Sequence, residues 1–592
     1  MLEITGSGPP AAPRFDALLP GSGGRSIRFY DARGVLRADT LAEVLPVLRA
    51  VEDALARGLH AAGFVSYEAA PALDPVLPVR DAEPGFPLAR FGIFAAREEV
   101  RSAPAAAGAW ELGPWRASVE AAEYTEHVRE IRERIAAGET YQVNHTLRLR
   151  ADFRGDERAF YGHLCQTQAA EYCAYLPGDR YSVLSASPEL FFRWADDELE
   201  LRPMKGTRPR GRWPAEDHAL AAELLASPKE RAENLMIVDL LRNDAGRISE
   251  FGSVHVPRLF EVESYPTIHQ LTSTIRARVR AGTTLTEVFR ALFPCGSVTG
   301  APKISTMGVI AELENAPRGI YTGAIGFASP GESVFSVAIR TLVLDRASGV
   351  VQMGVGSGIT WDSQAPDEYE ECFAKAAFVR ADPVQFELLE TLLLEGTGQV
   401  FLLDEHLARL AASADRWGFR CDVGAIRQRL LQDARTEHGT GAGACKLRLR
   451  LARDGAVRVE SQRLPPESAA PVKVAICAEP VDSRDPMLYH KTTRREPYDR
   501  RRAAHPDRDD VLVVNERGEL TESTLANLVV ARNGELWTPP VDAGLLPGVF
   551  REVLLREGEI RERTLRPEDL WEADGVYLIN SVRKWRTATV TP

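Results

Sequence analysis

Residues Tyr181–Ala186 (YSVLSA) and Glu230–Leu241 (ERAENLMIVDLL) together decide the fold class. The first stretch has the composition of a β-strand. The second places Leu235, Val238 and Leu241 at helical spacing. Stretches of both kinds are mixed over the first part of the chain, without a βαβ rhythm of regular length. We therefore expect a large α+β sandwich rather than a doubly wound parallel sheet.

The composition is that of an ordinary globular protein, with 44% hydrophobic and 26% charged residues among 592. A formal net charge of -12 argues against a nucleic-acid binder. The sequence contains no run of about 18 apolar residues, so it predicts no membrane span. The N-terminus lacks the pattern of a signal peptide. The seven cysteines are scattered, which predicts reduced thiols and a cytoplasmic location.

A boundary between two domains is predicted near Arg380–Pro383, where a helical run ends before a proline. We expect a first domain at residues 1–382 and a second at residues 383–592. Just after the boundary, Phe386–Leu392 predicts a strand and Asp404–Arg416 predicts a helix.

Lysine is rare in this chain, which has eight lysines among its 72 Lys and Arg residues. Two of them, Lys205 and Lys491, lie in segments where chemistry would require an amine. Arginine stays protonated and forms no imine, whereas the pKa of a lysine can be lowered until its amine is free. We therefore treat these two lysines as candidate catalytic residues.

Two pairs of glutamates are candidate metal ligands. Glu230 and Glu233 are three residues apart in the helical stretch, and Glu368 and Glu371 repeat that spacing. Lys375 follows one helical turn later. Each pair alone is typical of a solvated helix face. If the pairs converge, their four carboxylates suit Mg²⁺, which keeps waters and leaves room for an anionic substrate.

Two stretches of small residues are candidate anion sites. Pro294–Lys303 (PCGSVTGAPK) is a long turn whose backbone N–H groups can approach an anion, and Val355–Ile359 (VGSGI) is a second. Short glycine turns are weak signals when each is taken alone.

Taken together, most of residues 1–380 resembles the chorismate-utilising enzymes, the family of the first components of anthranilate synthase and aminodeoxychorismate synthase. The resemblance implies the large two-sheet sandwich of anthranilate synthase component I. It rests on Tyr141–Asn144 (YQVN), Glu233–Asp244 (ENLMIVDLLRND), Gly296–Lys303 (GSVTGAPK), Tyr321–Gly326 (YTGAIG), Ala338–Thr341 (AIRT) and Gly356–Ile359 (GSGI).

The resemblance also implies roles for individual residues. The Mg²⁺ cluster would consist of Glu230, Glu233, Glu368 and Glu371. The substrate carboxylates would be held by Tyr321, Arg340, Lys375 and the backbone amides around Gly356, Ser357 and Gly358. His269 and Thr299 would face the reacting ring.

Within that family, Lys205 is expected to decide the product. Anthranilate-forming members carry a small residue at this place, whereas the p-aminobenzoate branch carries a lysine that attacks the ring and expels the C4 hydroxyl. Burial and neighbouring cations, including Arg202 and Arg208, are expected to lower the pKa of this lysine. Gln142 replaces the lysine base of water-adding members, and Asn234 replaces the family's usual histidine.

The second domain contains a candidate set of pyridoxal phosphate ligands. Lys491 is the candidate for the imine, and Glu522 could lie opposite the pyridine nitrogen. Arg409 could clamp the phosphate, and Gly548 and Val549 could offer backbone N–H groups at the start of a helix.

In this order, residues 384–592 resemble the fold-type IV pyridoxal phosphate family, which includes class IV aminotransferases and aminodeoxychorismate lyase. The resemblance implies a smaller α+β domain of two subdomains. It makes Leu578–Arg583, with Asn580 and Ser581, the late turn that contacts phosphate or substrate. Arg494 stands where stand-alone lyases carry an asparagine, which leaves lyase or aminotransferase chemistry open.

The two halves predict one route: chorismate and ammonia give 4-amino-4-deoxychorismate, which then loses pyruvate to give p-aminobenzoate for folate. One alternative is an anthranilate synthase chain fused to a class IV aminotransferase, and another is a second half that is only an interaction domain. The chain shows no glutaminase segment, so we expect a separate glutamine amidotransferase subunit. The fold-type IV resemblance also implies a homodimer through the second domain.

Overall fold

The computed structural model describes residues 14–16, 25–101, 108–168, 170–265, 267–381, 386–439, 443–466 and 470–591. The predicted domain boundary at 382/383 lies outside the described residues. The chain forms two compact units. No helix of the described chain is long and apolar enough to cross a membrane. All seven cysteines are free thiols.

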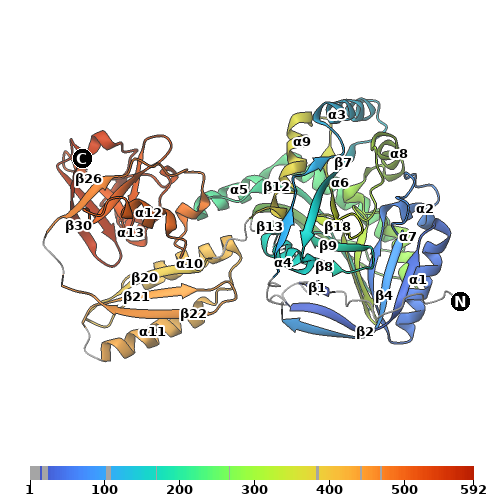
Figure 1. Cartoon of the computed structure of the whole chain (residues 1–592), viewed down its shortest axis with the longest axis horizontal. Coiled ribbons are helices and arrows are strands. Elements are labelled where there is room, and N and C mark those ends of the chain that lie inside the picture. Colours follow the sequence, from blue (N-terminus) through green and yellow to red (C-terminus); the bar gives the residue numbers. More distant parts are fainter. Residues whose placement is uncertain are drawn as a thin grey trace. The chain divides into compact units, whose positions relative to one another are not determined.

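The first unit contains one continuous path of antiparallel strands that folds into two sheets (Figure 1). The first sheet runs in the order β11 (Glu198–Arg202), β10 (Leu190–Ala195), β17 (Glu332–Val337), β16 (Ala324–Ser329), β3 (His60–Val65), β4 (Ala89–Arg101) and β2 (Arg25–Ala38). The second sheet runs in the order β8 (Tyr172–Leu176), β9 (Tyr181–Ser187), β18 (Thr341–Asp345), β19 (Val350–Ile359) and β7 (Gln142–Gly155). Strand β1 (Arg14–Asp16) pairs with both β2 and β8 and so joins the two sheets.

An apolar core fills the space between these sheets, with Phe29 and Phe327 of the first sheet against Val183 of the second. Helices cover the outer face of each sheet. On the first sheet they are α1 (Leu41–Ala56), α6 (Pro228–Gly246) and α7 (Leu285–Leu292). On the second they are α3 (Ala121–Ala136), α4 (Glu157–Gln168), α8 (Lys303–Leu313) and α9 (Ala365–Ala374). The expected sandwich is confirmed, as are the strand at Tyr181 and the helix over Glu230–Leu241.

The second unit has two sheets of its own (Figure 1). The smaller is antiparallel and consists of β20 (Leu388–Leu394), β21 (Cys445–Leu451) and β22 (Val457–Arg463), packed against α10 (Leu403–Trp417) and α11 (Val423–Gly439). The larger runs in the order β25 (Leu520–Ser523), β24 (Asp510–Val514), β23 (Val472–Ile476), β30 (Lys584–Val590), β29 (Gly575–Asn580), β26 (Asn527–Arg532), β27 (Glu535–Thr538) and β28 (Arg561–Glu562). The predicted strand and helix are confirmed as β20 and α10.

The second unit also takes in two short segments from early in the chain, Pro209–Ala222 and Ser264–Ile268. Arg210 and Asp217 form a buried two-pronged ion pair within it, with nitrogen–oxygen distances of 2.8 and 2.7 Å. The carbonyl of Gly211 accepts a hydrogen bond from the Arg416 guanidinium at 2.9 Å. This unit is therefore not continuous in sequence.

Candidate active sites

The amine of Lys205 lies among residues from three other elements of the first unit. Lys205 belongs to β12 (Met204–Pro209), and its Nζ is 3.8 Å from Oε2 of Glu233 on α6. It also lies against Gly358 of β19 and Gln142 at the start of β7. A Cβ atom on Gly358 would be 2.5 Å from Lys205 Nζ and 2.4 Å from Gln142 Nε2. A side chain at position 358 would therefore displace the ends of the Lys205 and Gln142 side chains.

Helix α9 brings the second glutamate pair and a further amine toward this place. Lys375 ends α9, and its Nζ is 2.5 Å from Oε1 of Glu371, one turn earlier on the helix. The same Nζ donates a hydrogen bond to the carbonyl oxygen of Gly356 at 2.8 Å. Lys375 thus ties the helix that carries Glu368 and Glu371 to the strand that carries the glycines.

The charges of this site act on one another. Burial lowers the pKa of Lys205, the carboxylate of Glu233 opposes that lowering, and the ammonium of Lys375 adds to it. Glu371 and Glu368 also act on the pKa of Lys205, which places both carboxylates within its electrostatic reach. Burial likewise raises the pKa of Glu233. The structure therefore brings together the predicted nucleophile and the predicted carboxylates.

The carboxylates fit a divalent cation by their chemistry. Burial and the neighbouring charges of Glu230 and Glu368 raise the pKa of Glu233, because a negative charge is costly there. A hard cation with oxygen ligands would relieve that cost. Among the described residues, no group of three or more His, Cys, Asp or Glu side chains is spaced to hold a metal ion.

The cation that helps to lower the pKa of Lys205 is Lys375, not the predicted Arg202 and Arg208. Arg202 is paired with carboxylates elsewhere. The guanidinium of Arg208 contacts Oε1 of Glu230 at 3.2 Å, so its charge acts on the proposed metal ligand. Neither arginine is among the main influences on the pKa of Lys205, and each is paired with a carboxylate.

Asn234 supports the strand that carries Lys205. Its Nδ2 donates to the carbonyl oxygens of Lys205 at 3.3 Å and Leu271 at 3.2 Å, and its Oδ1 accepts from Ser273 Oγ at 2.6 Å. Both ends of this amide are used within the protein. Asn234 is therefore a positioning residue for Lys205.

Glu189 is a site residue that the sequence reasoning missed. It is buried, it accepts a hydrogen bond from Ser297 Oγ at 2.6 Å, and burial raises its pKa to about 7. The charge of Lys205 and a hydrogen bond from the backbone of Met204 act against that rise. A carboxyl group with this pKa can hold or release a proton at neutral pH. The available signal was an acidic residue close behind the predicted strand Tyr181–Ala186.

Of the predicted substrate ligands, Tyr321 is buried and Arg340, beside the end of α9, is partly buried. One guanidinium nitrogen of Arg340 donates to the carbonyl oxygen of Lys375 at 2.6 Å. Burial lowers the pKa of Arg340 to about 10 and raises the pKa of Tyr321. The Arg340 guanidinium is costly to bury without an anion nearby, which agrees with the predicted contact to a carboxylate.

Three other predicted residues are buried, and two of them use their hydroxyls inside the fold. Ser357 Oγ is 2.9 Å from the hydroxyl of Tyr124, on the face of β19 opposite to Gly358. Thr299 Oγ1 donates to the carbonyl oxygen of Cys295 at 3.2 Å. His269 lies at the start of β14 (Ile268–Arg278) and is buried. Ser357 can therefore offer only its backbone amide to a ligand.

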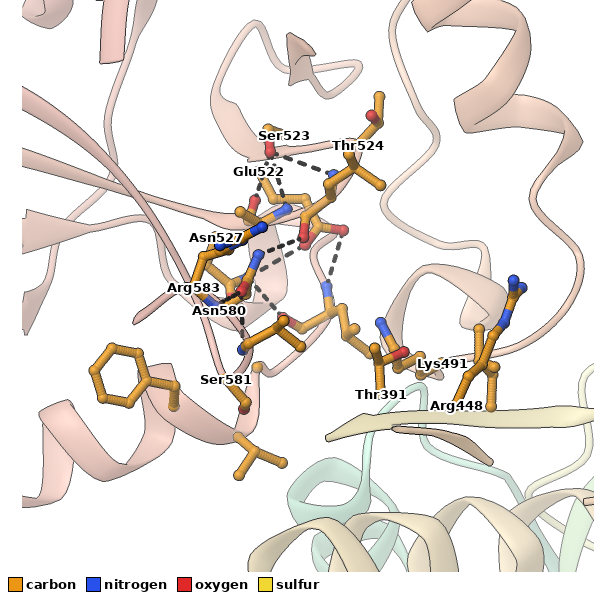
Figure 2. A pocket seen from close by; sticks show the side chains of 18 of the residues that line it. Thr391, Arg448, Lys491, Glu522, Ser523, Thr524, Asn527, Asn580, Ser581 and Arg583 are labelled. Carbon is orange, nitrogen blue, oxygen red and sulfur yellow. Dashed lines mark hydrogen bonds between the residues drawn. The ribbon is translucent and has the colours of Figure 1, made fainter. Parts of the chain in front are cut away.

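A cavity of about 450 Å³ lies in the second unit. All seven predicted cofactor ligands line it, and Figure 2 shows several of them. These seven are Arg409, Lys491, Glu522, Gly548, Val549, Asn580 and Ser581. Residues separated by more than 170 positions thus meet around one cavity, as the sequence predicted.

Lys491 and Glu522 have the protonation properties that the cofactor requires. Burial, aided by the charge of Arg409, lowers the pKa of Lys491 to about 8. Burial raises the pKa of Glu522 to about 7. The Glu522 carboxylate accepts hydrogen bonds from the Tyr498 hydroxyl at 2.9 Å and the Asn527 amide at 3.2 Å, which fix its orientation. A buried carboxylate held in this way fits a protonated pyridine nitrogen.

The groups that would hold the phosphate lie at the start of α13 (Val549–Arg556). Gly548 precedes the helix as its N-cap, and the first turn of a helix carries free N–H groups. Arg409 extends from α10 and donates to the carbonyl oxygen of Pro547 at 3.2 Å, while Glu390 neutralises part of its charge. This set fits a phosphate. Asn580 accepts from two backbone N–H groups and so shapes its turn.

Comparison with known proteins agrees with this division. A family model described as chorismate binding enzyme matches residues 24–381, and one for amino-transferase class IV matches residues 387–590. The chain therefore belongs to the chorismate-binding enzymes. More particularly, it is a chorismate-binding domain fused to a class IV aminotransferase domain.

Individual relatives resemble the first domain. An aminodeoxychorismate synthase of Streptomyces pristinaespiralis is 49% identical over 255 residues, 43% of this chain and 35% of that protein. The aminodeoxychorismate synthase component 1 of Klebsiella aerogenes is 43% identical over 278 residues, 47% of this chain and 61% of that protein. Anthranilate synthase component I of Streptococcus pneumoniae shares the fold, with a TM-score of 0.55 and 25% identity over 64% of this chain and 94% of that one. The match spans 35% and 61% of the two curated relatives' lengths.

Proposed function

We propose that this chain makes p-aminobenzoate in two steps. The first domain would convert chorismate and ammonia to 4-amino-4-deoxychorismate, and the second would eliminate pyruvate from that product. The observation that carries the proposal is the amine of Lys205, which lies 3.8 Å from Glu233 and against the backbone of Gly358. An anthranilate-forming site needs no amine at this place.

In the first step Lys205 would act as the nucleophile. Burial lowers its pKa, which favours the uncharged amine that can form a bond to the substrate ring. As that bond forms, the C4 carbon–oxygen bond breaks, and the hydroxyl leaves as water with a proton from Glu189. Ammonia then forms the new bond at C4 while the bond to Lys205 breaks.

The carboxylates of the first site would hold Mg²⁺, whose charge neutralises an anionic substrate. Its ligands would be Glu230, Glu233, Glu368 and Glu371. Support comes from Glu233, whose pKa is raised by burial and, in addition, by the charges of Glu230 and Glu368. Arg340, Lys375 and Tyr321 would hold the substrate carboxylates, with His269 and Thr299 facing the ring.

In the second step pyridoxal phosphate would supply an electron sink for the substrate's C4 carbon. Lys491, once displaced by the substrate amine, would move the proton between ring C4 and the leaving enolpyruvyl group. Its pKa of about 8 suits that exchange near neutral pH. Glu522 would keep the ring nitrogen protonated, and Arg409 with the amides at Gly548 and Val549 would hold the phosphate, near Asn580 and Ser581.

We propose that ammonia comes from a separate glutamine amidotransferase subunit, and that the second domain forms a homodimer. Product identification tests the function as a whole. The chain is incubated with chorismate, Mg²⁺, ammonium and pyridoxal phosphate, and the aromatic product is separated by chromatography. We expect p-aminobenzoate and an equal amount of pyruvate. Anthranilate, with its amine in the ortho position, would refute the assignment.

A further inference from the structure

The cavity of the second unit is strongly cationic although the chain carries a net charge of -12. Among the described residues that line it, eight are lysines or arginines and one, Glu522, is acidic. The eight are Arg409, Lys446, Arg448, Arg463, Lys491, Arg494, Arg495 and Arg583. A cavity with one sign of charge concentrates ligands of the other sign. Its ligands are therefore expected to carry several negative charges.

Several of these cations already have partners. Arg409 is paired with Glu390, and Lys491 is the proposed site of cofactor attachment. Arg495 and Arg583 donate to backbone carbonyl oxygens. By contrast, four side chains have no hydrogen-bond or ion-pair partner within the described chain: Lys446 and Arg448, which are partly buried, and Arg463 and Arg494, which are exposed. The two partly buried cations, Lys446 and Arg448, are thus available to a ligand.

The strand β21 fixes where these two side chains point. Burial alternates along this strand. Every second residue, including Leu447 and Leu449, packs into the core with α10 and α11, and the residues between them face the other way. Lys446 and Arg448 are two of these intervening residues. Arg450 is the third, and it is neutralised by Glu387 at 2.6 Å.

Arg448 lies on β21, next to the strand β20 that contacts Lys491. In the β20–β21 ladder it is directly opposite Thr391. Leu389, two residues before Thr391 and on the same face of β20, donates its N–H to the carbonyl oxygen of Lys491 at 2.9 Å. Figure 2 shows Thr391, Arg448 and Lys491 among the side chains of this cavity. A ligand joined at Lys491 would thus lie in the same cavity as the side chain of Arg448.

We propose that Lys446 and Arg448 bind the carboxylates of a dianionic substrate and so select it over amino acids with one carboxylate. This inference rests on the proposed function and names the residues that recognise its intermediate, which carries two carboxylates. The phosphate of the cofactor is assigned to Arg409 and the start of α13, so Lys446 and Arg448 are the partly buried cations left available to the substrate. Charge-assisted hydrogen bonds to carboxylates are the strong ones in such a site.

Binding to the full-length chain loaded with pyridoxal phosphate tests the proposal without turnover. The probes are benzene-1,4-dicarboxylate and benzoate, and the readout is the change in the visible absorbance of the bound cofactor. We expect the wild type to bind the dicarboxylate more tightly than benzoate. Lys446→Gln and Arg448→Gln should each weaken dicarboxylate binding about tenfold or more, with a smaller effect on benzoate. Arg448→Lys should restore much of the loss, because it keeps the charge.

Arg458→Gln is the matched control. Arg458 is exposed on β22, pairs in register with Arg450 and does not line the cavity, so its removal changes the charge of the sheet but not of the site. Equal dicarboxylate affinity in Arg448→Gln, Lys446→Gln and Arg458→Gln would overturn the proposal. So would a wild type that binds benzoate as tightly as the dicarboxylate.

Kinetics separate this inference from the proposed function. With supplied 4-amino-4-deoxychorismate, the two variants should raise KM for pyruvate release about tenfold while kcat changes little. If the wild type releases no pyruvate, the lyase function is refuted, and the binding comparison still decides the role of the cations. If the wild type releases pyruvate and KM is unchanged in both variants, the function stands and the inference fails.

Discussion

At the scale of single residues, the two lysines resemble each other in physical setting. Burial lowers the pKa of Lys205 and of Lys491, and in each case a nearby cation, Lys375 or Arg409, adds to the effect. A neighbouring carboxylate, Glu233 or Glu390, opposes the lowering in each case. Such an amine can serve as a nucleophile and still accept a proton later in the cycle.

Gly358 gives a sharp test of the position of the Lys205 amine. In Gly358→Ala the new methyl group would lie 2.5 Å from Nζ, so the amine must move away. We expect aminodeoxychorismate formation to fall at least about 100-fold, as displacement of a reacting group by about 1 Å can cost that much. Lyase activity on supplied intermediate should stay. Gly246→Ala on α6 is the control, because no atom lies within 4 Å of its new Cβ. Normal synthase activity in Gly358→Ala would contradict the geometry.

The pKa of Lys491 predicts how the apo chain takes up its cofactor. Because burial disfavours the ammonium form, the pKa is about 8 instead of the ordinary 10.5, and the free amine appears at lower pH. The rate of pyridoxal phosphate uptake, followed by visible absorbance, should therefore rise with pH to a midpoint near 8. A midpoint near 10.5 would show that Lys491 is solvated.

The residues of both sites differ in how far the sequence could predict them. Lys205, Lys491 and the glutamates stand in motifs or in periodic helices, which carry a local signal. Glu189 lies in a turn between two strands and depends on burial, which no local pattern shows. The roles of Asn234 and Arg448 depend on which strands lie beside them, and that is a property of the folded sheet.

At the scale of elements, strand β12 connects a proposed catalytic residue of the first unit to a segment of the second unit in the chain. It carries Lys205 and leads directly into Pro209–Ala222, a segment that belongs to the second unit. The carbonyl oxygen of Arg212 in this segment is 3.1 Å from Nε2 of His490, which precedes Lys491 in the chain. The sequence predicted no such segment, because its contacts join residues about 200 to 280 positions apart.

The buried pair of Arg210 and Asp217 is expected to hold this segment in place. The exposed fractions of their side chains are 1% and 10%, so Asp217→Asn leaves an arginine charge buried without its partner. We expect a loss of about 3 kcal/mol in the free energy of unfolding of the second unit. Thermal unfolding followed by circular dichroism measures it. Asp239→Asn removes the partner of the exposed Arg242 and should cost less than about 0.5 kcal/mol. Equal effects of the two substitutions would show that the segment is not held by this pair.

At the scale of the whole molecule, the two domains are expected to be separable in their chemistry. Each site has its own lysine and its own set of charged neighbours, and no residue is assigned to both. In Lys491→Ala we expect 4-amino-4-deoxychorismate to accumulate at the wild-type rate without p-aminobenzoate, as measured by chromatography of the products. Addition of ethylenediaminetetraacetate should stop its formation, because Mg²⁺ is removed. Loss of the first activity in Lys491→Ala would contradict this independence.

The most direct test of the central claim is to find the bond between Lys205 and the substrate. The chain is mixed with chorismate and Mg²⁺ without ammonia, quenched in acid, digested and analysed by peptide mass spectrometry. We expect the peptide that contains Lys205 to gain the mass of chorismate less one water, and the gain to be absent in Lys205→Ala. An unmodified Lys205 peptide, together with full p-aminobenzoate output from Lys205→Ala, would contradict the account.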